Sequence, residues 1–264
     1  MKVQRMNESI HTNILLTGGS GNLGQAIVHS GLFPALITPS EHDLDITDTD
    51  AIAEHFGRYD IDAVIHCAAL ARMIACENDP VLAITTNIIG TSNLVNEVIA
   101  YERKAHKKIR FIHISTDGVY PGTRGQYAES DETIPYNNYG WTKLGAECAV
   151  NLLSDFCIIR TRFFNPDTIK FDESAVDIFT SSVPVEYLVR AIGILLESDF
   201  VGTINVGGDR DSDYNKFREY KPSLKPCSRE DIVKNIPIAL ASDASMDVTA
   251  ARSGCMPPER ARIR

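Results

Sequence analysis

The sequence predicts an α/β fold, a doubly wound parallel sheet with a small carboxyl-terminal lobe. Three observations lead to this prediction. Apolar runs alternate with helical patterns, a glycine-rich turn follows the first apolar run, and the periodic pattern is lost in two later stretches. Regular alternation of strands with crossover helices is typical of a parallel sheet that carries helices on both faces.

Six apolar runs have the length and composition of strands that are buried on both faces. Five helical patterns lie between these runs, and each is long enough to cross over the sheet. The expected strands are residues 13–17, 35–38, 63–66, 110–115, 156–160 and 203–206, and the expected helices are residues 23–30, 49–56, 81–101, 139–153 and 185–197.

The composition limits what the chain can bind. It has 264 residues, 44% of them apolar, and a net charge of −9. A chain with this negative charge lacks the excess of basic residues that typically binds a nucleic acid or an anionic membrane surface. No apolar run approaches the ~20 residues that span a bilayer, and the first residues lack the apolar core of a signal peptide, so we expect a cytoplasmic protein.

The cysteines form no metal-binding or disulfide pattern. Six of them are scattered without a C-x-x-C pair or a neighbouring histidine motif, so we expect free thiols and no metal. The last residues form a short basic tail with Arg260, Arg262 and Arg264, which we interpret as a frayed terminus.

The glycine-rich turn from Gly18 to Gly24 has the spacing G-x-x-G-x-x-G between a strand and a helix. Glycines let the backbone approach a pyrophosphate, and the helix amino terminus supplies N–H donors. A tight strand-to-helix connection is the simpler alternative, but the position after a buried strand indicates a dinucleotide site. The candidate cofactor contacts in this turn are Gly18, Gly21, Asn22, Leu23 and Gly24.

The end of the second strand bears on the choice of cofactor, because an acidic residue there usually binds the ribose hydroxyls of NAD. The corresponding position in this chain is Ser40. Ser40 and His42 can accommodate a ribose phosphate, whereas Glu41 and Asp43 would repel it if either pointed inward. NADP is favoured over NAD, and the choice stays open.

The periodic pattern is lost over residues 166–182, and the chain becomes polar and rich in proline after Val206. These stretches can form a lobe over the carboxyl edge of the sheet. We therefore expect a dinucleotide-binding Rossmann domain of residues 1–163 and 183–206, and a small substrate-binding lobe of residues 164–182 and 207–264.

Tyr139 and Lys143 lie four residues apart on an expected helix, so both side chains project from one face. A nearby ammonium favours tyrosinate, so we expect Lys143 to lower the pKa of Tyr139. The tyrosine can then protonate an alkoxide that forms when a nicotinamide reduces a carbonyl, and Lys143 can also bind the nicotinamide ribose. Such a pair alone is usually a surface feature.

Two hydroxyl residues, Ser115 and Thr116, follow the fourth expected strand, at the edge where α/β sheets bind ligands. They can simply cap the turn. Together with Tyr139 and Lys143, however, Thr116 becomes the third candidate catalytic residue, because its hydroxyl can hydrogen-bond the same carbonyl oxygen.

With these motifs, the sequence resembles the extended short-chain dehydrogenase/reductases, and most closely the dTDP-4-dehydrorhamnose reductase group. The resemblance covers roughly residues 13–210. The matching elements are residues 17–24 (TGGSGNLG), 44–48 (LDITD), 62–69 (DAVIHCAA), 115–117 (STD) and 139–143 (YGWTK).

The resemblance implies further cofactor contacts. Asp45 and Ile46 would flank the adenine, and Ala68 and Ala69 would line the path of the phosphates and ribose. Asn87 would support the active site from the central helix, although a helix-surface amide is an equally ordinary explanation.

The implied activity is NADPH-dependent reduction of a nucleotide-linked 4-keto-6-deoxy sugar, as in dTDP-rhamnose biosynthesis, by an NAD(P)-dependent oxidoreductase that can form a homodimer. Candidate substrate contacts, besides Thr116 and Tyr139, are Asp117, Arg162 and Arg72, the last of which is also explained as a solvated arginine. Gly118 departs from the Thr-Asp-Glu of sugar-nucleotide dehydratases, so dehydration is disfavoured.

Two other functions remain open. One is a nucleotide-sugar epimerase, or a bifunctional 3,5-epimerase and 4-reductase, which would need an additional acid/base pair. The other is an NADP-binding regulatory subunit similar to the beta subunit of methionine adenosyltransferase, against which the presence of Thr116, Tyr139 and Lys143 argues.

Overall fold

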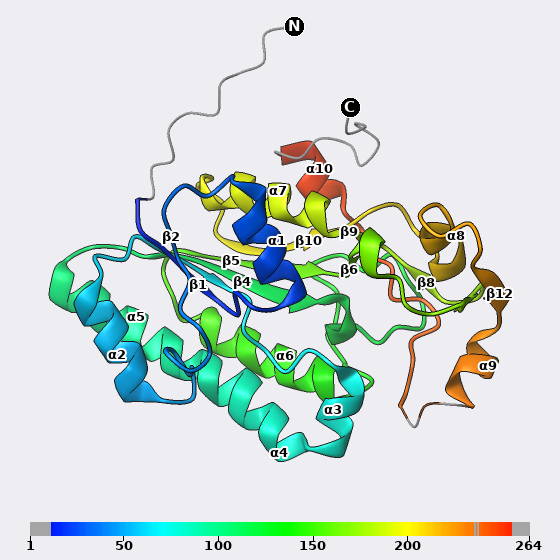
Figure 1. Cartoon of the computed structure of the whole chain (residues 1–264), viewed down its shortest axis with the longest axis horizontal. Coiled ribbons are helices and arrows are strands. Elements are labelled where there is room, and N and C mark those ends of the chain that lie inside the picture. Colours follow the sequence, from blue (N-terminus) through cyan, green and yellow to red (C-terminus); the bar gives the residue numbers. More distant parts are fainter. Residues whose placement is uncertain (1–11, 235, 237, 255–264) are drawn as a thin grey trace, which may run out of the picture.

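The computed structural model describes residues 12–234, 236 and 238–254. At its centre is a six-stranded sheet in the order β10-β5-β4-β3-β1-β2, and every neighbouring pair is parallel (Figure 1). The doubly wound parallel sheet is therefore confirmed. The strands are β1 (Ile14–Thr17), β2 (Leu36–Ile37), β3 (Ala63–His66), β4 (Arg110–Thr116), β5 (Phe156–Thr161) and β10 (Gly202–Val206).

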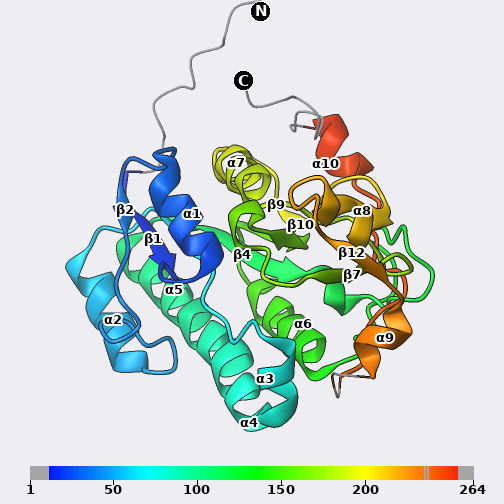
Figure 2. The ribbon, with the colours of Figure 1, turned by 45° about the vertical axis from the view of Figure 1, so that its right-hand side comes forward.

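Helices cover both faces of this sheet (Figures 1 and 2). On one face, Leu23 and Ile27 of the first helix pack with the apolar side of the helix that begins at Val185. On the other face, Phe56, Leu94 and Val150 come from three further helices and form a second core. The strands are apolar on both sides because each side meets one of these cores. The two layers are α1 (Asn22–Ser30) with α7 (Val185–Leu196), and α2 (Thr49–Arg58) with α5 (Thr91–Ala105) and α6 (Asn138–Val150).

The helix expected over residues 81–101 has a different form. Two short helices, α3 (Met73–Asn78) and α4 (Pro80–Ala83), lead into a π-helix, η1 (Ile84–Gly90), and only then into α5. Asp79 starts α4 by accepting a hydrogen bond from the Leu82 amide at 2.9 Å. Such wider turns are frequent at functional sites, and this one contains Asn87.

Short paired strands occupy the regions where the sequence loses its periodicity, and Figure 1 shows them with α8 (Asp213–Arg218) and α9 (Arg229–Val233) at the right-hand side of the main sheet. Two of the three pairs join residues before α7 to residues after β10, so chain segments far apart in sequence form one unit, and the third pair lies just before α7. The pairs are β6 (Phe163–Phe164) with β9 (Val183–Pro184), β7 (Glu173–Ala175) with β12 (Lys225–Cys227), and β8 (Phe179–Thr180) with β11 (Asp211–Ser212).

An aromatic cluster holds this unit together. Phe217 of α8 meets Phe164 edge to face at 4.9 Å between ring centroids and Phe171 at 5.1 Å, and Tyr220 also packs on Phe164. After this unit, Met246 forms an isolated bridge with Tyr127 in the loop after β4, Asn205 of β10 donates to the Asp247 carbonyl at 3.2 Å, and the chain enters α10 (Thr249–Gly254).

Five cysteines lie in the described part of the chain and all are unpaired, whereas Cys255 and the basic tail fall outside it. Within the same part, there is no cluster of three or more side chains suited to bind a metal ion. None of the helices found there has the length and apolar character needed to cross a bilayer.

Two histidines face each other inside the sheet. His66 on β3 and His113 on β4 are paired in register, and their rings lie 5.3 Å apart. Both ring nitrogens of His66 are bonded, to Thr17 at 2.7 Å and to Thr91 at 2.9 Å. Neither ring nitrogen of His113 has a hydrogen-bond partner among the described residues. Burial lowers the pKa of His66 to about 3 and that of His113 well below its ordinary value, and the charge of Lys143 adds to both shifts.

These histidines predict a loss of stability in mild acid. Both stay neutral in the folded chain but bind protons below about pH 6.5 when unfolded, so their contribution is complete above that pH and falls as the pH is lowered. From pH 7 to 5.5 the pair should reduce the free energy of unfolding by about 2 kcal/mol. Urea titrations of the wild type and of His113→Leu measure this loss. Because the variant keeps only one of the two histidines, the decrease in its free energy of unfolding that comes from the pair should be about half as large. A pH dependence equal to that of the wild type would contradict this assignment.

Candidate active site

The glycine turn brings β1 and β3 into close contact where the strand order reverses. Gly18 has φ of 72°, and a Cβ atom at this position would lie 2.6 Å from the Ala68 amide nitrogen. A Cβ atom at Gly24 would collide with the Gly18 carbonyl. Gly21 precedes α1 as its N-cap. Glycine is therefore required where the backbone turns and where the helix start packs onto the turn.

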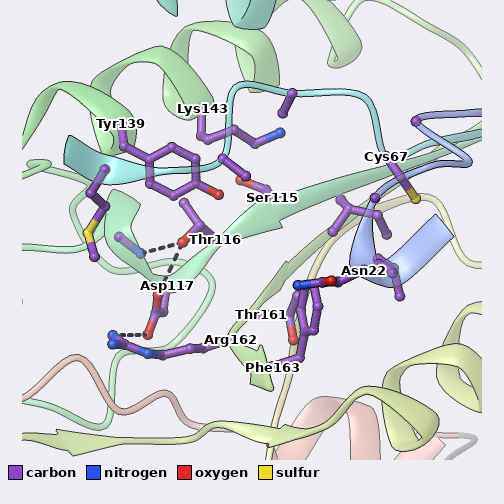
Figure 3. A pocket seen from close by; sticks show the side chains of 18 of the residues that line it. Asn22, Cys67, Ser115, Thr116, Asp117, Tyr139, Lys143, Thr161, Arg162 and Phe163 are labelled. Carbon is purple, nitrogen blue, oxygen red and sulfur yellow. Dashed lines mark hydrogen bonds and ion pairs between the residues drawn. The ribbon is translucent and has the colours of Figure 1, made fainter. Parts of the chain in front are cut away.

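A cavity of about 420 Å³ opens from this turn along the carboxyl ends of β1, β3, β4 and β5 (Figure 3). Its walls combine the glycine turn with the polar residues that follow β4 and begin α6. The lining residues are Gly18, Gly21, Asn22, Leu23, Gly24, Cys67, Ala69, Ala71, Met73, Ile114, Ser115, Thr116, Asp117, Gly118, Tyr136, Asn137, Tyr139, Lys143, Thr161, Arg162 and Phe163.

The three candidate catalytic residues meet in this cavity. Thr116 is the last residue of β4, and Tyr139 and Lys143 project from successive turns of α6 into the same space (Figure 3). Thr116 and Lys143 are buried, with 6% and 3% of their surface exposed. The four-residue spacing thus places the phenol and the amine on the face of α6 that covers the carboxyl end of the sheet.

The pKa of Tyr139 does not follow the sequence-based expectation. Burial and the neighbouring Asp117 carboxylate raise the pKa of Tyr139, and a hydrogen bond with Thr116 only partly offsets them. The expected lowering of this pKa by Lys143 is therefore wrong. Tyr139 is consequently a protonated phenol at neutral pH, the form that can donate a proton.

Lys143 has the opposite shift. Burial lowers the pKa of Lys143 to about 8, and the Glu147 carboxylate, one helical turn further along α6, opposes that effect. Cys67 at the end of β3 also faces the amine, while His66 and His113 are neutral neighbours in the sheet. The charge of Lys143 therefore depends on one buried carboxylate.

Glu147 is held by a network that spans the sheet. Its carboxylate accepts hydrogen bonds from Ser115 at 2.5 Å and from Arg160 Nη2 at 2.7 Å. Arg160 also donates to the Tyr120 hydroxyl at 3.0 Å, and Tyr120 donates to Asn205 on β10 at 2.9 Å. All five side chains are buried, so the network fixes α6 relative to β4, β5 and β10.

Asn87 is a second support for α6. It is buried, and its amide donates to Thr142 at 2.9 Å while its carbonyl oxygen accepts from the Leu70 amide at 2.7 Å. It thereby joins the loop after β3 to the helix that carries Tyr139 and Lys143. The alternative of a surface amide is excluded by this burial.

The start of α6 is tied down separately. Asn137 caps the helix by accepting a hydrogen bond from the Gly140 amide at 2.8 Å. Glu77 of α3 binds the backbone and the side-chain amide of Asn138, each at 2.8 Å. These contacts fix the first turn, from which Tyr139 projects.

Several predicted cofactor contacts lie outside the cavity lining. The Ser40 hydroxyl, after β2, donates to the Asp43 carboxylate at 2.7 Å. Asp45 accepts from the amide and hydroxyl of Thr47, both at 2.8 Å. Ile46 is buried, and Ala68 packs on Gly18 while its neighbour Ala69 lines the cavity. The structure thus shows Ser40 already engaged with an acidic group.

The predicted substrate contacts separate into two groups. Asp117 and Arg162 line the cavity and form an ion pair, with 3.5 Å between Nη1 and Oδ2. Arg72 is exposed and is not among the lining residues, although Ala71 and Met73 on either side of it are.

Two important residues were not predicted from sequence. Glu147 carried a usable signal, since it lies four residues after Lys143 on the same helix face. Tyr136 carried none, because it precedes α6 in a segment without periodicity, yet its phenol lines the cavity and burial raises the pKa of Tyr136 to about 12.

Comparison with curated proteins gives relatives of two kinds. The chain is 38% identical over 152 residues to a dTDP-4-keto-6-deoxy-D-glucose reductase of Streptomyces niveus, covering 56% of this chain and 51% of that protein. It is 31% identical over 183 residues to the methionine adenosyltransferase 2 subunit beta of Pongo abelii, covering 64% of this chain and 52% of the relative. The chain therefore spans about half the length of these relatives.

Solved structures extend the similarity over almost the whole chain. A dTDP-4-dehydrorhamnose reductase of Clostridium acetobutylicum has a TM-score of 0.82 at 26% identity, covering 94% of this chain and 95% of that one. A dTDP-4-dehydrorhamnose reductase of Bacillus anthracis in complex with NADP has a TM-score of 0.82 at 22% identity, with 94% of each chain covered, and shows the shared fold.

The family model described as the RmlD substrate binding domain matches residues 12–166. This match includes the glycine turn, the end of β4 and the whole of α6. The chain belongs to the RmlD substrate-binding domain family, within the extended short-chain dehydrogenase/reductases that resemble dTDP-4-dehydrorhamnose reductase.

Proposed function

We propose that this chain uses NADPH to reduce the 4-keto group of a nucleotide-linked 4-keto-6-deoxy sugar. The observation that carries the proposal is the convergence of Thr116, Tyr139 and Lys143 on one cavity that begins at the glycine turn. The named activity of the Streptomyces niveus relative supports the substrate class, and the NADP bound by the Bacillus anthracis protein supports the cofactor.

The residues at the turn fit a dinucleotide. Gly18 and Gly24 allow the tight turn, because a Cβ atom at either would collide with neighbouring backbone, and residues 21–24 put the amino terminus of α1 at the cavity. When bound, the nicotinamide supplies a hydride to the carbonyl carbon. Binding of a ribose phosphate near Ser40 requires Asp43 to turn away, because its carboxylate bonds the Ser40 hydroxyl.

In the proposed reaction, the substrate carbonyl oxygen lies between Thr116 and Tyr139. Thr116 donates its hydroxyl proton to this oxygen and orients the carbonyl, which requires the hydroxyl to turn from Asp117 Oδ1, to which it donates at 3.1 Å. Tyr139 gives its phenolic proton to the oxygen as negative charge develops there, so the carbonyl becomes a hydroxyl. Lys143 holds the nicotinamide ribose and supplies positive charge to the cavity, and solvent then restores the proton of Tyr139.

We assign substrate binding to the small paired strands beside the sheet, residues 164–182 and 207–254 of the described chain. The parallel pair β6 and β9 connects this unit directly to the cavity, because Phe163 of β6 is a lining residue. The nucleotide part of the substrate would lie along this unit while the sugar enters between Thr116 and Tyr139.

An NADP-binding regulatory subunit is the second candidate, and the 31% identity to a methionine adenosyltransferase subunit beta favours it. Such a protein would bind the dinucleotide at the same turn without turning over a sugar. The buried network around Glu147 is compatible with either function, so turnover has to be measured.

The central experiment follows NADPH oxidation by absorbance with dTDP- or UDP-linked 4-keto-6-deoxyglucose, with and without a separate 3,5-epimerase. Oxidation that requires the epimerase indicates a rhamnose-type reductase, and oxidation without it indicates a direct or bifunctional one. NADH in parallel reactions tests whether Asp43 excludes the phosphate. Binding of NADPH without oxidation by any sugar would contradict the proposal and favour the regulatory subunit.

Tyr139→Phe is the matched control for this experiment, because it removes one oxygen and keeps the ring. Turnover should fall by at least about a hundredfold, as expected when a general acid is lost, while the Kd for NADPH changes little. Equal turnover in the variant would refute the role of Tyr139.

The charge of Lys143 predicts a pH dependence. The amine is charged below its pKa of about 8, so turnover should decrease as the pH rises through that value. Glu147→Gln removes the carboxylate that stabilises the ammonium, and the decrease should then occur at lower pH. Ser115→Ala keeps the carboxylate and should keep the wild-type profile. Coincident profiles for wild type and Glu147→Gln would contradict this role.

A further inference from the structure

Asp117 has a buried carboxylate oxygen without a hydrogen-bond donor. Only 5% of its side chain is exposed. Oδ1 accepts a hydrogen bond from the Thr116 hydroxyl at 3.1 Å, whereas Oδ2 has no hydrogen-bond partner among the described residues. Buried polar atoms in folded proteins almost always have partners, so an unpaired one beside a cavity indicates a donor that arrives with the ligand.

Arg162, the neighbouring cation, does not donate a hydrogen bond to Asp117 Oδ2. Arg162 Nη1 lies 3.5 Å from Oδ2, and Arg162 Nη2 lies 3.7 Å from the carboxylate of Asp213. Both separations are longer than a normal hydrogen bond, so the guanidinium is shared between two acids. Thr180 holds the other oxygen of Asp213 at 2.9 Å. Arg162 therefore balances charge and leaves Oδ2 free to accept.

The charges around Asp117 Oδ2 exclude several chemical groups of a ligand from this part of the cavity. Asp117, Asp213 and Arg162 carry two negative charges against one positive charge, and Tyr136 adds a neutral phenol that faces Asp117 and Arg162. A phosphate or carboxylate here would be repelled, and an ether or carbonyl oxygen offers no proton. A hydroxyl group supplies the missing donor without adding charge.

The position of the hydroxyl follows from the neighbouring residue. Thr116 and Asp117 are consecutive, and their bonded side-chain oxygens are 3.1 Å apart. Oxygen atoms on adjacent carbons of one ligand can therefore meet both side chains. Gly118 adds no side chain beside these oxygens, whereas a Cβ atom there would lie 3.4 Å from the Thr116 hydroxyl and 3.9 Å from that of Tyr136.

We infer that Asp117 selects substrates with a hydroxyl group on the carbon next to the carbonyl that is reduced. In a 4-keto-6-deoxy sugar this is the hydroxyl at carbon 3. The inference rests on the proposed reductase function and adds the requirement for an α-hydroxy ketone. Burial raises the pKa of Asp117, and the charge of Arg162 opposes that effect. The ion pair with Arg162 also holds the Asp117 side chain in place, so we assign Arg162 a positioning role.

The test is a cycle of two substrates and two proteins. Wild type and Asp117→Ala are each assayed with the 4-keto-6-deoxy sugar nucleotide and with its 3-deoxy analogue, and kcat/KM is compared. The wild type should prefer the hydroxylated sugar by roughly tenfold to a hundredfold, the range of a hydrogen bond to a charged group. Asp117→Ala should use both sugars about equally.

Two further variants keep the test decisive. Asp117→Asn retains an accepting oxygen at nearly the same volume, so it should keep part of the preference even if the alanine variant folds poorly. Asp131→Asn changes an acid that pairs with Arg124 and is not among the cavity-lining residues, and it should keep the full preference. Equal use of both sugars by the wild type, or an undiminished preference in Asp117→Ala, would overturn the inference while reduction itself stands. Failure of the wild type to reduce either sugar would instead remove the proposed function on which the inference rests.

Discussion

The site depends on the close approach of α6 to the turn after β4. Gly140, in the first turn of α6, packs directly onto the Gly118 carbonyl oxygen, and a Cβ atom at Gly140 would collide with it. This backbone contact brings Tyr139 and Lys143 over the end of β4, where Thr116 and Asp117 emerge. Asn87, Glu77 and Glu147 maintain it with hydrogen bonds from three different segments. The arrangement is rigid because buried groups and a helix cap hold it.

The central sheet and its crossover helices were predictable because each buried parallel strand is a continuous apolar run. The interruption of the helix at η1 was not, since residues 84–90 fit an ordinary helical pattern and the contacts of Asn87 with Leu70 and Thr142 form only in the fold. The small lobe strands are two or three residues long, which is too short for any periodic signal. Their pairing across the chain is a tertiary effect.

The site was predictable where spacing on one helix or position at a strand end was sufficient. The sequence analysis correctly brought Thr116, Tyr139 and Lys143 to one cavity. It was wrong about the pKa of Tyr139, because the burial of the phenol and the carboxylate of Asp117 arise from separate segments that meet only in the fold. The hydrogen bond between Ser40 and Asp43 could not be predicted from the sequence either, although it bears directly on the choice between NAD and NADP.

The cavity thus combines a neutral phenol, an amine close to its titration range and an unpaired carboxylate oxygen within one wall. The first two suit proton donation and cofactor binding, and the third suits recognition of a hydroxylated substrate. Together they are the features on which the proposed reductase function rests, and a cavity that only binds a dinucleotide would not need them.

The most direct measurement of the proposed function is the transfer of deuterium from NADPH that carries deuterium at both hydrogens of nicotinamide C4 to a nucleotide-linked 4-keto-6-deoxy sugar. The account predicts one deuterium at carbon 4 of the product, detected by mass spectrometry and NMR, and no transfer with Tyr139→Phe over the same time. A product without deuterium, or an unchanged sugar in the presence of bound NADPH, would contradict it.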